Sequence, residues 1–293
     1  MTSSAPQRIA GKATILGVGM TIVRTLPTAR RRTIGAWCFL DHIGPVDLGT
    51  SHGMRVGPHP HIGLQTVTWL IEGEILHRDS LGSLQLIRPG QLNLMTAGRG
   101  ISHSEESPPE HPPGMHGVQF WIATPDADRH GEPAFAHHPE LPVFDHDGLQ
   151  VTVLLGEQQG RKSPGRIFSP LLGLELLADA AVQTGLPLRA DFEYGIQVLE
   201  GSLTVGEEVL EPGTLLYMEP GSELLALQAD AGFRAILIGG EPLQEQVLMW
   251  WNFVARTQSE LTTACKDWNA GAQYFGEVVG YPGDRLESPM PPW

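Results

Sequence analysis

Two histidines, His59 and His61, stand one residue apart in the segment HPHIGLQTVTWLIEG. In a β-strand, residues i and i+2 point to the same face with Cα atoms roughly 6.5–7 Å apart, so both imidazoles can reach one ion. His103 and Glu105 repeat this spacing further along the chain, after the glycine-rich stretch TAGRGIS. If the two strands face each other across a barrel, these side chains surround one point. The pattern predicts a mononuclear metal site with His59, His61, His103 and Glu105 as ligands.

The predicted ligand atoms are imidazole nitrogens and a carboxylate oxygen, which suit iron, nickel, copper, manganese or zinc better than calcium or magnesium. An octahedral ion with four protein ligands keeps about two positions open for a substrate or oxygen. A plainer interpretation is that these are ordinary surface or core histidines, because all twelve histidines fall between His42 and His146. The second pair, His103 and Glu105, favours the metal site. In a third interpretation, the ion only stiffens the barrel.

Strands are the elements that must position these side chains. Of the 293 residues, 35 are glycine and 24 are proline, and only 18% are charged, which favours many turns and short strands over long surface helices. Short apolar runs such as QTVTWLIEGEIL, LQLIRPGQLNLM and GVQFWIA are typical of strands. The sequence therefore predicts an all-β protein.

The segment at about 125–147 is rich in Pro, His and Asp without periodicity, which indicates a linker or a long surface loop. We therefore expect an N-terminal metal-binding domain at 1–135 and a C-terminal domain at 136–293. Near the end of the chain, Ser259 can cap a helix that stops near Gly271. This one short helix is expected to dock on a barrel, because it is not stable alone.

An internal comparison suggests that the two halves are copies of one β unit. Residues 59–73 and 187–201 both end in a strand that runs into Glu-Gly, and each is followed by Pro-Gly. Simple alignment puts Pro187 and Arg189 at the positions of the first two histidines, and Ala226 and Gln228 at those of His103 and Glu105. These side chains cannot form the same site. A metal ion is therefore expected only in the N-terminal half.

The chain also resembles a known family. Five segments are similar to segments of pirins: WCFLDHIGP, HPHIGLQTVTWLIEG, MTAGRGISHSE, MHGVQFWI and GGEPLQEQVLMWWNFVAR. The resemblance covers about residues 15–280. The resemblance implies two tandem cupin, jelly-roll-like β-barrels with a short C-terminal helix. It implies that the first barrel binds one transition-metal ion, iron in the first place, through His59, His61, His103 and Glu105. Where many cupins have a further glutamate ligand, this chain has Gln65, which is either a hydrogen-bonding partner of the site or an ordinary strand residue.

The resemblance implies a function as well. Pirins of this kind are associated with quercetin 2,3-dioxygenase activity, in which a flavonol binds the metal and oxygen cleaves its heterocycle with loss of carbon monoxide. In this hypothesis the substrates are a flavonol-like aromatic molecule and O2, and Glu105 is the catalytic residue that accepts the flavonol proton. The alternative is a non-enzymatic regulator that binds a protein partner according to the metal's presence or redox state.

The charge balance and the cysteines indicate the surroundings of the protein. With 19 basic and 33 acidic residues, the net charge of -14 argues against direct binding of nucleic acid. The basic patch at 30–32 is better explained as a solvated loop or strand edge. The sequence has two distant cysteines, no secretion signal and no apolar run long enough for a membrane span, which predicts a cytoplasmic protein. A monomer is preferred, because two barrels in one chain already supply the pairing that single-domain cupins often obtain by dimerising.

Overall fold

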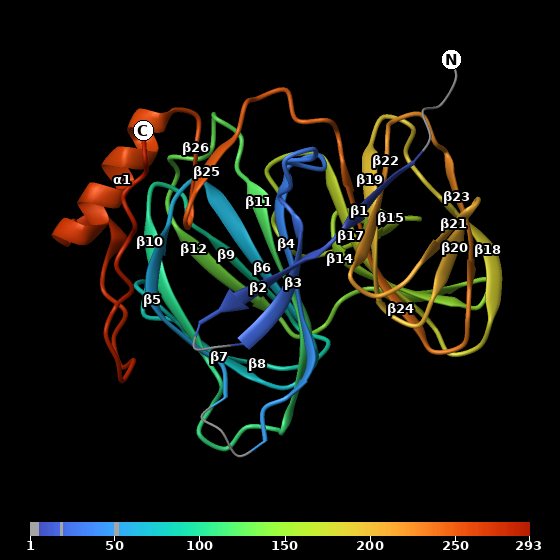
Figure 1. Cartoon of the computed structure of the whole chain (residues 1–293), viewed down its shortest axis with the longest axis horizontal. Helices are drawn as coiled ribbons and strands as arrows, with labels where there is room; N and C mark the ends of the chain where they lie inside the picture. The colour runs from blue at the N-terminus through green and yellow to red at the C-terminus, as the bar shows by residue number, and fades with distance from the viewer. Residues whose placement is uncertain (1–5, 18–19, 50–52) are drawn as a thin grey trace. The chain divides into compact units, whose positions relative to one another are not determined.

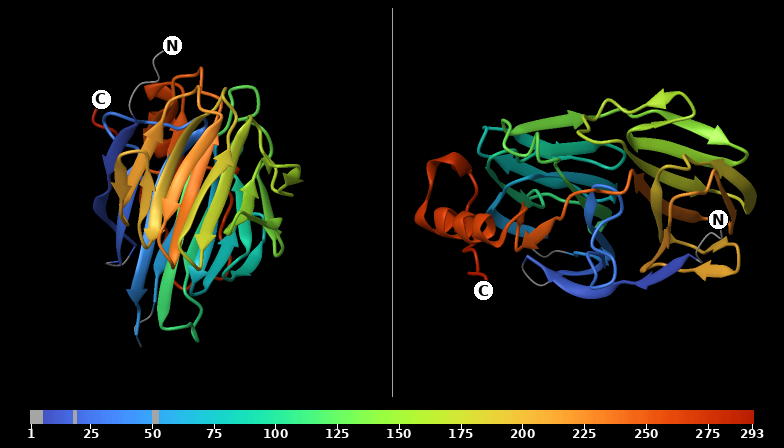
Figure 2. Two further views of the ribbon diagram at one scale, coloured as in Figure 1. Left: turned by 90° about the vertical axis from the view of Figure 1, so that its right-hand side faces the viewer. Right: turned by 90° about the horizontal axis from the view of Figure 1, so that it is seen from above.

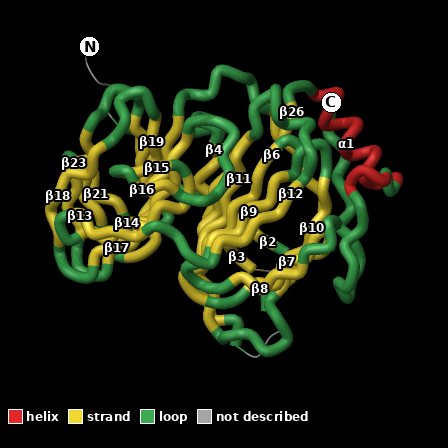
Figure 3. The backbone as a smooth tube through the Cα atoms, turned by 180° about the vertical axis from the view of Figure 1, so that it is seen from behind, coloured by secondary structure: helices red, strands yellow, loops and turns green. Residues whose placement is uncertain are grey.

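The computed structural model describes residues 6–17, 20–49 and 53–293. Its described residues divide into two compact units that are discontinuous in sequence. Of the described residues, 6–13, 23–42 and 140–243 belong to unit 1, and 14–17, 20–22, 43–49, 53–139 and 244–293 belong to unit 2. Each unit is built from two antiparallel sheets, which appear as yellow segments in Figure 3. The predicted all-β fold is confirmed.

Unit 2 contains the residues of the predicted metal site. Most of its larger sheet belongs to this unit, and the strand order is β12 (Ala134–His138), β9 (Leu92–Thr96), β6 (Leu64–Glu72), β11 (Gly114–Ala123), β4 (Trp37–Asp47), β3 (Met20–Leu26) and β2 (Lys12–Leu16). Residues 12–13, 23–26 and 37–42 of the last three strands are grouped with unit 1. Its smaller sheet has the order β5 (Arg55–His61), β10 (Ile101–Glu106), β7 (Ile75–Asp79) and β8 (Leu84–Ile87). Figure 1 labels the strands of both sheets.

Unit 1 repeats this arrangement. Its larger sheet has the order β1 (Gln7–Ala10), β22 (Thr214–Met218), β19 (Glu193–Glu200), β24 (Phe233–Gly240), β17 (Leu171–Ala178), β14 (Leu149–Leu155) and β13 (Val143–His146). Its smaller sheet has the order β18 (Val182–Pro187), β23 (Leu224–Ala229), β20 (Leu203–Val205) and β21 (Glu208–Leu210), and the hairpin β15 (Glu157–Gln158) and β16 (Arg161–Lys162) stands apart. Figure 2 shows the long strands of this unit side by side. The two units use the same strand order except at one edge of the larger sheets, where the sheet of unit 2 has its last strand in chain order, β12, and the sheet of unit 1 has its first, β1. The predicted duplication is therefore present in the topology.

Each unit buries its own apolar core, because alternate residues of a strand point to one face of a sheet. In β23 the alternation is complete: Leu225, Leu227 and Ala229 are buried, while Leu224 and Ala226 are exposed. The core of unit 1 is formed almost entirely by leucine, valine, isoleucine and aromatic side chains of both sheets. Unit 2 has a smaller apolar cluster, which leaves part of its interior to polar residues.

The segment predicted to be a linker contains two strands instead. β12 pairs with β9 at the edge of the larger sheet of unit 2, and β13 pairs with β14 at the edge of the larger sheet of unit 1. Both are edge strands, which tolerate prolines and polar residues nearby better than central strands do. Such strands lack the apolar alternation that predicts the other strands.

The C-terminal helix α1 (Gln258–Ala270) is present and ends at Gly271, as predicted, but its N-cap is Thr257 rather than Ser259. Thr257 and Glu260 form a capping box, in which each side chain bonds the backbone N–H of the other residue. Ser259 is exposed within the first turn. The short η1 (Gln273–Phe275) follows the helix.

The compact units do not follow the single boundary expected between residues 135 and 136. Apolar residues of α1, among them Leu261 and Trp268, pack on Phe253 and on Ile62 of unit 2. Phe253 lies in the hairpin of β25 (Leu248–Trp250) and β26 (Phe253–Ala255), and the red helix next to this hairpin in Figure 3 is α1. The tail therefore groups with unit 2, because its apolar face is buried there.

The cysteines and the basic residues 30–32 lie within the part of the chain that the structure describes. Cys38 and Cys265 are both buried, and neither of them is in a disulfide. In the basic region, Arg31 lies over the Tyr217 ring and 3.8 Å from a Glu193 oxygen, which fits a structural role. No helix in the described ranges is long and apolar enough to cross a membrane.

Candidate metal centre

The antiparallel ladder of β5 and β10 places the first three predicted ligands together. His59 lies directly opposite His103, and His61 lies two residues further along β5. β5 can contain Pro58 and Pro60 because it is the edge strand of its sheet, where a missing N–H costs little. The ladder shifts register between His103 and Glu105, and such bulges redirect side chains.

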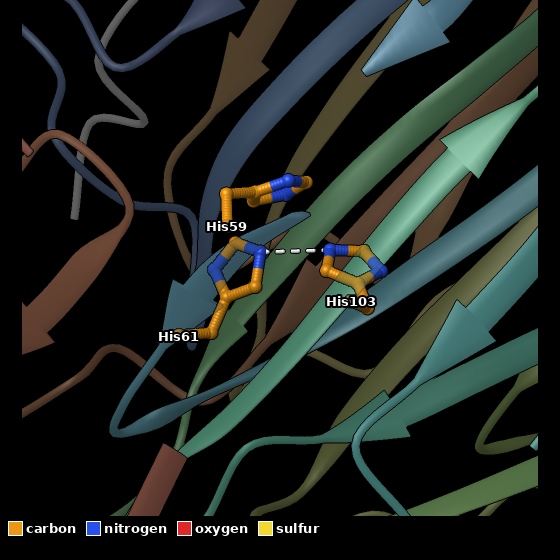
Figure 4. Close-up of side chains that lie close together, drawn as sticks. All are labelled: His59, His61 and His103. Carbon is orange, nitrogen blue, oxygen red and sulfur yellow. Dashed lines mark hydrogen bonds between the residues drawn. The ribbon is translucent and has the colours of Figure 1, made fainter. Parts of the chain in front are cut away.

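The three imidazoles converge on one point in the interior of unit 2, as Figure 4 shows. The Nε2 atoms of His61 and His103 are 3.0 Å apart, and the ring of His59 lies 4.3 Å from that of His103 and 5.0 Å from that of His61, centroid to centroid. One ring nitrogen of each histidine lies within 4.8 Å of the others. All three side chains are buried, with at most 6% of their surface exposed.

Hydrogen bonds at the far side of two rings fix which nitrogen carries the proton. His59 Nδ1 lies 2.8 Å from the carbonyl oxygen of Gly57, and His61 Nδ1 lies 2.9 Å from that of Asn252. A carbonyl oxygen can only accept, so Nδ1 donates in both cases and the neutral ring keeps its lone pair on Nε2. Burial lowers the pKa of His59 to about 4 and holds the pKa values of His61 and His103 well below their usual range. The rings are therefore neutral near pH 7.

Glu105 lies on another side of His103. It forms a second potential ligand group with His103 and His77, and it is not within the group of His59 and His61. Its carboxylate accepts a hydrogen bond from the Thr68 hydroxyl at 3.3 Å and another from Gln119. Burial raises the pKa of Glu105, more than the nearby His77 and these hydrogen bonds lower it.

His77 and Asp79 also belong to this cluster, although the sequence did not predict them as site residues. His77 lies opposite Glu105 in the β10–β7 ladder, and its Nδ1 is 3.4 Å from His103 Nδ1. Its ring is stacked on Phe135 of β12 at 4.3 Å, and its Nε2 lies 3.1 Å from an Asp79 carboxylate oxygen. A signal for this pair exists in the sequence, since His77 and Asp79 have the same i, i+2 spacing as the pairs that were identified.

Three further groups surround the site. Asn252 acts through its backbone oxygen in the turn between β25 and β26, so its side-chain type could not have revealed it. Gln65 is buried in β6, and its amide donates a hydrogen bond to the Thr96 hydroxyl at 2.9 Å. Trp121 packs edge-on against His61, with ring centroids 5.3 Å apart.

Unit 1 has apolar residues at the equivalent positions. The common Glu-Gly turn and the ladder registers match His59 with Leu186, His77 with Val205, His103 with Leu225 and Glu105 with Leu227. All four belong to or pack against the core of unit 1. Ala226 and Gln228, chosen by simple alignment, face outward instead, because that alignment is displaced by one residue. The corrected positions are also unable to bind a metal.

The three histidines fit a transition-metal ion. Two nitrogens bound to one ion at about 2.1 Å and at a right angle lie about 3.0 Å apart, which is the separation of the two Nε2 atoms. His61 has no proton on Nε2, since Nδ1 donates to Asn252, so its lone pair faces His103. Neutral imidazoles with second hydrogen bonds to carbonyl groups are typical of metal-binding histidines.

Comparison with known proteins agrees with the fold and the residue pattern. The pirin family model matches residues 19–122, and the model of the pirin C-terminal cupin domain matches residues 173–274. The chain belongs to the pirin family. It is therefore a bicupin, with one cupin barrel in each unit.

Relatives of this pirin cover nearly its whole length. A Pseudomonas aeruginosa protein named "Putative quercetin 2,3-dioxygenase PA1205" is 48% identical over 287 residues, which cover 98% of this chain and 91% of that protein. Human pirin is 29% identical over 270 residues, covering 88% and 90%. The crystal structure of a quercetin 2,3-dioxygenase from Acinetobacter baumannii has 47% identity and a TM-score of 0.96, and the match covers 98% of this chain and 96% of that one.

Proposed function

We propose that this pirin binds one transition-metal ion, iron in the first place, through His59, His61, His103 and Glu105, and that it cleaves flavonols with O2. The convergence of three buried, neutral imidazoles carries the proposal, because one ion could bind the ring nitrogens that all three turn toward the same point. The names of the Pseudomonas and Acinetobacter relatives support the reaction type.

In this proposal the ligand side chains hold the ion, and Glu105 also accepts a proton. The bound ion, with about two free positions, would supply sites for a substrate hydroxyl and for oxygen. Glu105 would accept the proton of that hydroxyl, because its carboxylate is buried beside His103, one of the proposed ligands. Thr68 and Gln119 would orient the carboxylate through their hydrogen bonds.

The test is turnover by purified protein reconstituted anaerobically with Fe(II). Quercetin absorbance, oxygen consumption and carbon monoxide release are followed together, with His61→Ala as the control that lacks a ligand. The proposal predicts that all three signals appear in the wild type and are absent from the variant. Retained metal without consumption of quercetin or oxygen would contradict the enzymatic proposal and favour a metal-dependent regulator, which a pull-down with metal-loaded and metal-stripped protein would then examine.

A further inference from the structure

A row of buried polar groups continues behind His103. His103 Nδ1 lies 3.4 Å from His77 Nδ1, and His77 Nε2 lies 3.1 Å from Asp79 Oδ2. The three side chains expose at most 2% of their surface, so water cannot replace these contacts. Each of these three side chains must therefore supply the hydrogen-bond partner of its neighbour.

Asp79 is the fixed end of this row. Its second carboxylate oxygen, Oδ1, accepts hydrogen bonds from the backbone N–H groups of Leu81 and Ser83, both at 2.9 Å. Burial raises the pKa of Asp79, but hydrogen bonds from His77 and Ser83 outweigh it and the pKa lies below its usual value. An ionised carboxylate has no proton to donate, so His77 must donate from Nε2.

The direction of the first hydrogen bond determines the direction of the second. A neutral His77 that donates from Nε2 has its lone pair on Nδ1, which faces His103 Nδ1. His103 then carries its proton on Nδ1 and keeps a lone pair on Nε2, the atom that faces His61. The stacked ring of Phe135 holds the plane of His77 in the orientation that this requires.

We propose that Asp79 and His77 are positioning residues, which set the tautomer and the orientation of His103 so that its Nε2 can bind the metal ion. The inference rests on the proposed function, in which His103 is a ligand. It gives His103 a partner equivalent to the carbonyl groups of Gly57 and Asn252, which serve His59 and His61.

Two other states of this cluster compete with the proposal. If His77 were doubly protonated, it would donate to His103 Nδ1, and His103 would then donate from Nε2 to His61, which blocks both lone pairs. Alternatively, His77, His103 and Glu105 could bind an ion of their own. With the first ion also bound, His103 would have to lose both ring protons, because a neutral imidazole has only one free lone pair.

Asp79→Asn separates these states with little change of shape. The asparagine oxygen can still accept from Leu81 and Ser83, but its amide donates to His77 Nε2 and reverses both hydrogen bonds behind it. We expect His103 to move its proton to Nε2 and the affinity for Zn²⁺ to fall about 10–100-fold. His77→Phe should also weaken binding, whereas His77→Gln, whose amide oxygen can accept from His103, should bind close to the wild-type level. Glu106→Gln, a neighbouring carboxylate bound to Arg78, is the control.

The experiment combines ¹⁵N–¹H correlation spectra of the histidine rings in metal-free full-length protein with Zn²⁺ titration. The proposal expects Nδ1–H on His103 in the wild type, Nε2–H in Asp79→Asn, and one Zn²⁺ per chain. Any of three results would overturn the proposal. The first is a proton on Nε2 of His103 in the wild type, and the second is an unchanged affinity for Zn²⁺ in Asp79→Asn. The third is two Zn²⁺ ions per wild-type chain, of which one is lost in His77→Phe. A wild-type chain that binds no Zn²⁺ but shows Nδ1–H would contradict the proposed function instead, so the two failures are distinct.

Discussion

Thr68 donates a hydrogen bond to Glu105 across the interior of unit 2, and the carboxylate that receives it is buried. Glu105→Gln keeps the size of the side chain and one oxygen that can accept from Thr68, but it cannot accept a proton. If Glu105 is the general base, turnover of quercetin should fall about 10²–10⁴-fold in metal-reconstituted protein. Steady-state kinetics measure this effect.

The adjacent Glu106 provides the matched control. It points to the other side of β10, where Arg55 and Arg78 pair with it. Glu106→Gln should leave turnover near the wild-type value. Equal losses in both variants would show that the effect comes from disturbance of β10 rather than from lost proton transfer.

Metal binding should stabilise the protein, because an unfolded chain cannot hold three converging histidines. Zn²⁺ at a free concentration of 100 times its dissociation constant should add about 2.7 kcal/mol to the stability of unit 2, and a chelator should remove it. Thermal unfolding with and without metal measures the effect. His130→Ala, at an exposed histidine, should keep the shift, and a shift of equal size in His61→Ala would count against the ligand set.

The capping box of α1 predicts a difference between two hydroxyl residues. Thr257→Ala should cost about 1 kcal/mol in the first turn of the helix, because the N–H of Glu260 loses its partner. Amide exchange in this turn should then be about fivefold faster. Ser259→Ala should have little effect, since Ser259 lies beyond the cap. Hydrogen–deuterium exchange of the two variants decides between the two caps.

The lowered pKa of Glu260 predicts that its contribution to the stability of the protein depends on pH. Burial raises its pKa, but hydrogen bonds from Arg129 and from the backbone of Arg256 and Thr257 outweigh it and lower the pKa to about 2. Since this value lies below the ~4.3 of an unfolded chain, the stabilisation is complete above pH ~4.3 and is lost as the pH falls towards 2. The difference in urea midpoint between wild type and Glu260→Gln should therefore be largest near pH 6 and shrink in acid. A difference that is constant from pH 6 to pH 3 would contradict this assignment.

The sequence predicted the strands and the duplication because apolar alternation and Glu-Gly turns are local patterns. It could not place β12 and β13, whose pairing at sheet edges depends on the partner strand rather than on their own residues. It also missed Thr257, since its capping role depends on where the helix begins by one or two residues.

At the site, the i, i+2 spacing predicted that His59 and His61 share a face, and the ladder of β5 and β10 brings His103 to them. The relation of Glu105 to His77 was not predictable in this way, because it depends on the bulge in β10 and on the ladder to β7. Asn252 contributes a backbone oxygen that any residue type could supply. The leucines that replace the site in unit 1 could be recognised only from the registers of the ladders, which the sequence alone does not show.

The most direct test of the ligand set is elemental analysis of protein isolated without added metal, together with His61→Ala and Glu105→Ala. The account predicts one transition-metal ion per chain in the wild type, loss of most of it in His61→Ala, and a reduced content in Glu105→Ala. Full retention of the metal in both variants would contradict the proposed site.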